Sequence, residues 1–179
     1  MRITISGPPG SGKTTACNKL SDAIGMKAIV FGEVFREMAA ERKMSLAEFG
    51  RMAEEDGTID EMIDSRIIEI AKKNDNIILE SRLSAHLLLR NGIPAFKIYL
   101  DASPGVRVAR VGMRDNETFE QALADTIERQ ASEEKRYMLY YDIDINDTSI
   151  YDLIVNTDII GPEEVVDHMI CALEERGCL

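Results

Sequence analysis

The sequence predicts an α/β fold in which helices cover both faces of a parallel sheet. Short runs of β-branched and other apolar residues alternate with longer stretches of helical periodicity along the 179 residues, which is the pattern of βαβ units. A glycine-rich turn joins the first apolar run directly to the first helical stretch. A chain of this length forms one compact domain with a sizeable core, so we expect a single domain over residues 1–179.

Five strands are expected from the apolar runs, and they are placed at residues 3–6, 28–31, 76–80, 97–101 and 152–156. The first helix is expected from residue 13 to about residue 24. Three later helix starts have the residue spacing of a capping box, namely Ser45 with Glu48, Thr58 with Glu61, and Thr118 with Gln121. Two more starts place proline at the first helical position, in Ser103-Pro104 and Gly161-Pro162.

Two segments between the strands are longer or more polar than a simple connection. A crossover between parallel strands needs about a dozen residues, whereas about forty lie between the second and third strands. The surplus from Gly32 to Asn74 is predicted to form a substrate-binding flap over the sheet edge. The stretch from Asp115 to Arg136 carries many charged residues and is expected to be the most mobile part of the chain.

Composition and charge exclude several classes of protein. The net charge of −11 argues against binding of nucleic acid through a broad basic surface, although a few arginines in a cleft are enough for a small anionic substrate. No run approaches the roughly 18 apolar residues of a membrane span, and the N-terminal residues are not signal-like, so we expect a cytoplasmic protein without membrane partners. Cys17, Cys171 and Cys178 are expected to stay reduced, and His86 and His168 are too isolated for a zinc site.

The glycine-rich turn has the GxxxxGK[ST] pattern of a phosphate-binding loop, in the position between a strand and a helix where that loop operates. Its backbone amides and the helix N-terminus are expected to hold nucleotide phosphates. Lys13 is expected to reach the β and γ phosphates, and the Thr14 hydroxyl to ligate Mg²⁺. The nucleotide-binding residues are therefore Gly7, Pro8, Pro9, Gly10, Ser11, Gly12, Lys13, Thr14 and Thr15.

Other classes of protein that use this phosphate-binding loop are excluded, because the sequence lacks their further motifs. No NKxD motif at a strand end is present to read guanine, and the third strand lacks the adjacent acids of helicases and motors. That strand ends instead with Glu80 and, two residues later, Arg82, which places metal and phosphate partners beside the loop. Arg110 and Arg114 stand one helical turn apart and are candidates for closing over the ATP phosphates.

With these features the chain resembles the cytidylate kinases of the compact archaeal type. The resemblance rests on the loop, on Gly32-Glu33-Val34-Phe35-Arg36, Leu79-Glu80-Ser81-Arg82-Leu83 and the segments 129–137 and 149–157. It implies a three-layer P-loop kinase fold with strand order 2-3-1-4-5. It also implies a core of about residues 1–31, 75–114 and 138–179, an insertion for the nucleoside monophosphate over about 32–74, a lid over about 115–128, and a lid-exit helix to 137.

The resemblance also implies roles for individual residues. Arg36 and Arg82 grip the monophosphate, because a guanidinium can donate two parallel hydrogen bonds to one phosphate. Arg129 and Arg136 neutralise or flank the transferring phosphoryl group, and Glu133 contacts the acceptor sugar or positions an arginine. Bacterial members carry an acid where Leu83 stands, so in this chain recognition of the base must come from elsewhere in the insertion or from backbone groups.

The implied reaction is transfer of the γ-phosphoryl group of MgATP to CMP, with dCMP as a further acceptor. Lys13, Arg129 and Arg136 are the expected catalytic residues, and Glu80 is expected to hold a metal-bound water. One alternative is another small-molecule kinase, such as an adenylate or uridylate kinase. The alternative from another class is an ATP-binding regulatory factor without acceptor chemistry. We expect a monomer whose partners are small nucleotides.

Overall fold

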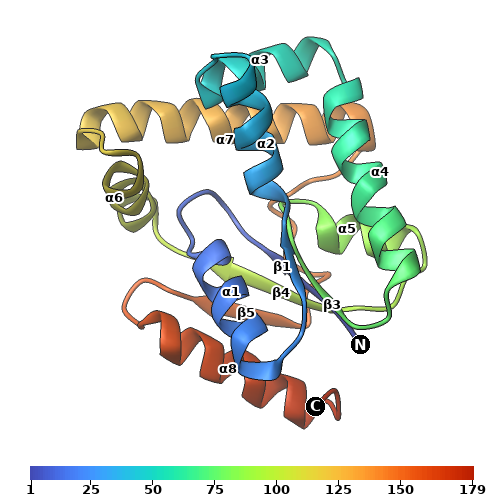
Figure 1. Cartoon of the computed structure of the whole chain (residues 1–179). Coiled ribbons are helices and arrows are strands. Elements are labelled where there is room, and N and C mark those ends of the chain that lie inside the picture. Colours follow the sequence, from blue (N-terminus) through green and yellow to red (C-terminus); the bar gives the residue numbers. More distant parts are fainter.

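The computed structural model describes residues 1–179 and confirms the α/β architecture (Figure 1). All strand pairs are parallel, and the order across the five-stranded sheet is β2-β3-β1-β4-β5, as the family resemblance implied. The strands are β1 (Arg2–Ser6), β2 (Ala28–Val30), β3 (Ile77–Glu80), β4 (Phe96–Asp101) and β5 (Leu153–Asn156).

Two apolar clusters cover the two faces of the sheet. The helices are α1 (Lys13–Ile24), α2 (Phe31–Glu41), α3 (Leu46–Glu55), α4 (Thr58–Lys73), α5 (Ser84–Arg90), α6 (Pro104–Asp115), α7 (Phe119–Tyr141) and α8 (Pro162–Glu175). One cluster joins α1 and α8 to Ile78, and the other joins α4 and α5 to Ile77 and Leu79. Successive residues of β3 therefore point to opposite faces, and both faces are buried, which explains why the strands read as continuous apolar runs.

Most of the expected helix starts are confirmed, and one is wrong. Complete capping boxes begin α3 and α7, and prolines occupy the first turns of α6 and α8. Thr58 does not cap α4, since the N-cap is Gly57 and Thr58 is already helical. Its amide and hydroxyl donate instead to the Asp56 carboxylate at 3.1 and 2.6 Å, because a carboxylate two residues earlier is a stronger acceptor than the Thr58 hydroxyl.

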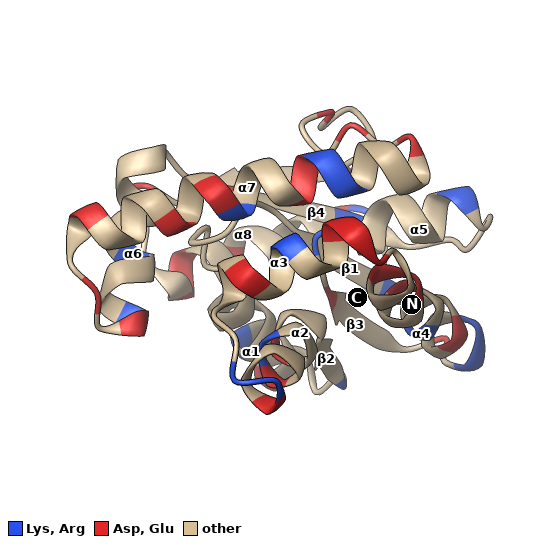
Figure 2. Ribbon diagram, turned by 90° about the horizontal axis from the view of Figure 1, so that it is seen from above, with Lys and Arg blue, Asp and Glu red and all other residues tan.

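Helices α2, α3, α6 and α7 lie beyond the carboxyl ends of the strands (Figure 1). Residues 31–73 form α2, α3 and α4, and α7 is one continuous helix of 23 residues that packs on both α3 and α6. Seen from above, α7 crosses the molecule over the sheet (Figure 2). No helix combines the length and hydrophobicity that a membrane span requires.

Candidate active site

The turn between β1 and α1 depends on three glycines for its shape. Gly7, Gly10 and Gly12 have φ values of 146°, 81° and 88°, a region that residues with a side chain rarely adopt. A Cβ atom on Gly10 would lie 2.5 Å from the backbone oxygen of Arg107, so this position also has no room for a side chain. The turn can therefore curl its amides inward only with glycine at these positions.

Lys13 is half-buried and projects into the turn that precedes it. Its Nζ donates to the backbone oxygen of Pro8 at 2.9 Å. Burial lowers the pKa of Lys13 to about 7, while the nearby Glu80 carboxylate acts in the opposite direction. An anion bound in the turn would favour the charged form of this lysine.

Thr14 and Glu80 bring two oxygen atoms that could ligate a metal ion together at the edge of the sheet. The Thr14 hydroxyl donates to the Glu80 carboxylate at 3.2 Å, and Glu80 is 3% exposed at the end of β3. Burial raises the pKa of Glu80, and Lys13 and the Thr14 hydrogen bond oppose that rise. Hydroxyl and carboxylate oxygens fit Mg²⁺, which is held in kinases by one or two protein ligands together with water and substrate phosphates.

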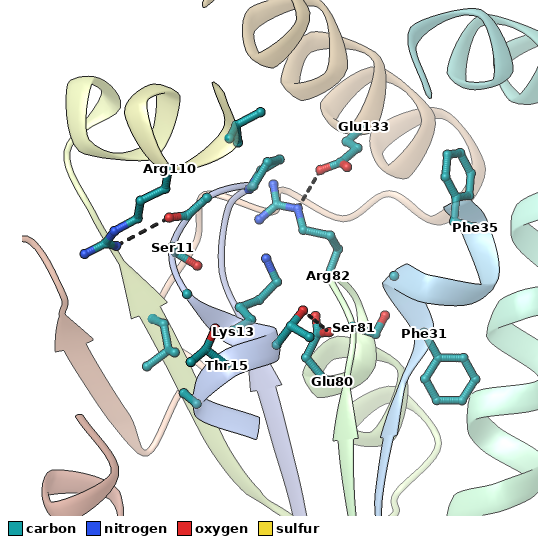
Figure 3. Close-up of a pocket in the computed structure, with 18 of the residues that line it drawn as sticks. Ser11, Lys13, Thr15, Phe31, Phe35, Glu80, Ser81, Arg82, Arg110 and Glu133 are labelled. Carbon is teal, nitrogen blue, oxygen red and sulfur yellow. Dashed lines mark hydrogen bonds and ion pairs between the residues drawn. The ribbon is translucent and has the colours of Figure 1, made fainter. Parts of the chain in front are cut away.

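A cavity of about 540 Å³ lies between this turn and helices α2, α4, α6 and α7 (Figure 3). Most of the predicted site residues line it together, whereas Gly7 and Pro8 do not. Those that line it are Pro9, Gly10, Ser11, Gly12, Lys13, Thr14, Thr15, Arg36, Glu80, Arg82, Arg110, Arg114, Arg129, Glu133 and Arg136. One cavity thus holds both the phosphate turn and the predicted acceptor residues.

Glu133 organises two of the predicted arginines. Its oxygens lie 2.6 Å from Nε of Arg82 and 3.0 Å from Nε of Arg129, and it is 4% exposed (Figure 3). Burial by itself would raise the pKa of Glu133, but the guanidiniums outweigh it and hold the pKa at about 2. Burial and the neighbouring charges of Arg114 and Arg129 lower the pKa of Arg36. These cations converge in a place that favours an anion.

Arg110 and Arg114 differ in their surroundings although both line the cavity. Arg110 donates to the hydroxyl and the backbone oxygen of Thr157 at 2.8 and 2.6 Å, which ties α6 to the segment after β5. Arg114 is exposed and is paired with Asp115 at 2.7 Å. Arg114 is therefore the freer of the two to reach a ligand.

Arg136 is the predicted residue with the most extensive contacts. It is 3% exposed, donates to the Gly50 oxygen at 3.2 Å, and has Nε 2.9 Å from the Asp60 carboxylate. Its guanidinium lies 5.5 Å from the centre of the Phe35 ring and 5.6 Å from that of Tyr137. These contacts hold Arg136 between α3, α4 and α7.

Several cavity residues were missed by sequence reasoning. Asp60 and Asp64 line the cavity from α4, and Phe31, Phe35 and Ile63 add apolar surface. The two aspartates stand four residues apart and so share a helical face, but charged residues at that spacing are also common on solvated helices. Leu83 is not part of the cavity, since its side chain is 1% exposed within the core.

Residues 2–159 match the model of the cytidylate kinase-like family. The chain is similar to a cytidylate kinase of Halorubrum lacusprofundi, with 45% identity over 97% of this chain and 90% of that protein. It is also similar to one of Methanosphaerula palustris, with 49% identity over 88% and 89%.

Among solved structures, a shikimate kinase from Aquifex aeolicus aligns with a TM-score of 0.61 and 17% identity, over 99% of this chain and 98% of that one. An uncharacterized protein from Eubacterium ventriosum aligns with a TM-score of 0.71 and 16% identity, over 98% and 99%. At these identities the two structures support the fold alone.

Proposed function

The chain belongs to the cytidylate kinase-like family, and we propose that it transfers the γ-phosphoryl group of MgATP to CMP, with dCMP as a second acceptor. The products are ADP and CDP, or dCDP from dCMP. One observation supports the proposal beyond family membership. Lys13 of α1, Arg82 of the segment between β3 and α5, and Arg129 of α7 line a single cavity, so cations surround the place where two phosphate chains would meet.

On the donor side, the amides of residues 7–15 and the Lys13 ammonium are proposed to bind the ATP phosphates. The free amides at the start of α1 and the ammonium neutralise charge on the β and γ phosphates. Arg114 is proposed to close over them from α6, whereas Arg110 acts mainly by fixing the segment at Thr157.

The metal site is proposed at Thr14 and Glu80. Thr14 would ligate Mg²⁺ directly and Glu80 would hold one of its waters, since the two side chains lie side by side at the end of β3. When bound, Mg²⁺ supplies charge neutralisation at the β and γ phosphates.

On the acceptor side, Arg36, Arg82 and Arg129 are proposed to hold the 5′-phosphate of CMP. Glu133 keeps the guanidiniums of Arg82 and Arg129 in place by pairing with both. Arg136 is proposed to flank the acceptor nucleotide, because its contacts with Gly50 and Asp60 hold it against α3 and α4.

The transfer is proposed to be a direct in-line step in which the acceptor phosphate oxygen bonds to the γ phosphorus as the bond to ADP breaks. A phosphate monoester is already anionic, so it needs little help from a general base, and alignment with charge neutralisation carries the catalysis. We further propose that residues 32–74 act as the acceptor-binding insertion and that the region about 115–128 closes as a lid. Closure would exclude water and so limit hydrolysis of ATP.

We also propose that the protein acts as a monomer in the cytoplasm, on nucleotides and not on nucleic acid. The free thiols of Cys17, Cys171 and Cys178 are in keeping with a reducing compartment. The net charge of −11 disfavours a polyanionic partner outside the cavity.

A coupled assay of ADP formation with CMP, dCMP, UMP, AMP and shikimate tests the proposed reaction. The expected result is the highest kcat/KM with CMP or dCMP. A preference for AMP or UMP would overturn the choice of acceptor. Calorimetry with CMP alone tests the alternative of an ATP-binding regulator, because such a protein would give no binding heat with the monophosphate.

A further inference from the structure

The cavity has an apolar end on the side away from Ser11 and Arg110. In Figure 3, Phe31 and Phe35 of α2 lie across the cavity from those two residues, with Lys13 and Arg82 between. Aromatic and aliphatic side chains with a few polar groups are the usual lining for a planar, partly polar ligand. This end of the cavity therefore suits a nucleobase, since the cationic centre takes the phosphates.

Two carboxyl groups of α4, those of Asp60 and Asp64, line the cavity one helical turn apart, and Asp60 contacts Arg136 beside Phe35. The two differ in their ion pairing. Asp60 forms an ion pair with Arg136, with 2.9 Å between its Oδ2 and Nε of the arginine, although neither of these two atoms has a hydrogen-bond partner. Asp64 is 7% exposed, lines the cavity, forms no ion pair, and has one carboxyl oxygen, Oδ2, without a hydrogen-bond partner. Burial raises the pKa of Asp64 to about 7, and a hydrogen bond with Tyr141 opposes the rise. A buried carboxyl oxygen left without a donor costs free energy, which a ligand that offers an N–H group would recover.

We propose that Asp64 accepts a hydrogen bond from the exocyclic amino group of the acceptor's base and thereby selects cytosine over uracil. The inference rests on the proposed function and names the group that reads the base. Cytosine carries an amino group at C4 where uracil carries a carbonyl oxygen, so uracil would place an acceptor against the carboxylate. Two facing acceptors with no donor between them are unfavourable in a buried site.

Other groups near the base end are less suited to this role. Leu83 has no hydrogen-bonding group in its side chain and is buried in the core outside the cavity. Asp60 is engaged by Arg136, whose guanidinium it holds beside Phe35. Asp64 is the carboxyl at this end that combines a place in the cavity with the lack of a cationic partner.

The test compares kcat/KM for CMP and UMP in the wild type and in Asp64→Asn, at about pH 8.5, where the carboxyl is ionised. Asparagine has nearly the same shape but can offer an N–H donor to the carbonyl oxygen of uracil. We expect kcat/KM for CMP to fall about 10- to 100-fold and that for UMP to rise. Glu61→Gln, an exposed change on the same helix, is the control and should leave the CMP/UMP ratio unchanged.

A second measurement needs no variant of Asp64. The wild type is assayed with the monophosphate of pyrimidin-2-one riboside, which has hydrogen in place of the amino group of CMP. A loss of kcat/KM of about tenfold or more relative to CMP is expected, and no loss would overturn the inference even if Asp64→Asn failed to fold.

The outcomes separate this inference from the proposed function. A wild type that fails to phosphorylate CMP overturns the proposed function and the inference with it. A wild type that prefers CMP, together with an Asp64→Asn variant that keeps the same CMP/UMP ratio, overturns the inference alone. Equal losses with both nucleotides would show that Asp64 only supports the fold through Tyr141.

Discussion

Replacing Glu133 with glutamine removes the negative charge shared by two arginines of the proposed acceptor site and keeps the shape of the side chain. The Glu133 carboxylate is 4% exposed and lies 2.6 Å from Arg82 and 3.0 Å from Arg129. Without it, the side chains of Arg82 and Arg129, which are only 10% and 20% exposed, lose their shared counter-charge. We therefore expect Glu133→Gln to lose both stability and the arginine geometry that is proposed to hold the acceptor phosphate.

The size of the stability loss follows from the pKa of Glu133. Lowering this pKa from the usual 4.5 to about 2 on folding corresponds to about 3 kcal/mol. Breaking a buried ion pair by removing one partner typically costs about 3 to 5 kcal/mol, a range that includes the value obtained from the pKa. Because the folded-state pKa is the lower one, this stabilisation is fully present above about pH 4.5 and is lost as the pH falls towards 2.

Urea unfolding of the wild type and Glu133→Gln at a series of pH values measures this effect. The difference in unfolding free energy should be about 3 kcal/mol at neutral pH and should shrink below about pH 4.5. Glu128→Gln is the matched control on the same helix, because Glu128 pairs with Arg51 at 2.8 Å while the two side chains are 41% and 61% exposed. That variant should lose less than about 1 kcal/mol. A loss below 1 kcal/mol for Glu133→Gln, or one independent of pH, would show that the ion pairs of Glu133 do not stabilise the fold.

Three further variants test the donor and acceptor sides. Lys13→Met should abolish phosphoryl transfer and keep the wild-type circular dichroism spectrum; normal turnover would refute the role of Lys13. Because the lysine pKa falls to about 7 on folding, the ligand-free wild type should gain stability from about pH 7 to about pH 10 relative to Lys13→Met in urea unfolding. Gly10→Ala should cost about 1 to 3 kcal/mol in the same assay and raise the KM for ATP, since its Cβ would meet the Arg107 backbone oxygen at 2.5 Å. Arg36→Lys should lower kcat/KM for CMP about tenfold with little change in the KM for ATP, because an ammonium cannot donate two parallel hydrogen bonds; equal effects on both substrates would contradict this.

Local signals in the sequence were enough to place the strands and the phosphate turn. Continuous apolar runs fixed β1, β3 and β4, because strands buried on both faces have no polar alternation. The spacing of Gly7, Gly12 and Lys13 was enough to place the turn. Both glycines have a positive φ, which residues with a side chain rarely adopt. The prediction that Thr58 caps α4 was wrong because the Thr58 hydroxyl donates to the nearby Asp56 carboxylate instead.

Burial of charged side chains could not be predicted from the sequence. Asp64 and Glu61 both lie on α4, but of these two only Asp64 lines the cavity, whereas Glu61 is exposed. The order of charged residues along the helix does not distinguish its buried face from its exposed face. The role of Arg107 was also missed. This residue is 8% exposed and donates hydrogen bonds to the backbone oxygens of Ala102 at 3.1 Å and Pro9 at 3.4 Å. It therefore supports the phosphate turn from α6. Such roles depend on contacts between segments far apart in the chain.

A crystal structure of the protein with CMP and a non-hydrolysable ATP analogue would show whether both nucleotides bind in the one cavity between the phosphate turn and the arginines. We expect the CMP phosphate to contact Arg36 and Arg82, the γ phosphate to lie beside Lys13, and the cytosine amino group to donate a hydrogen bond to Asp64. A complex in which these arginines point into solvent, with the monophosphate bound outside the cavity, would contradict this expectation.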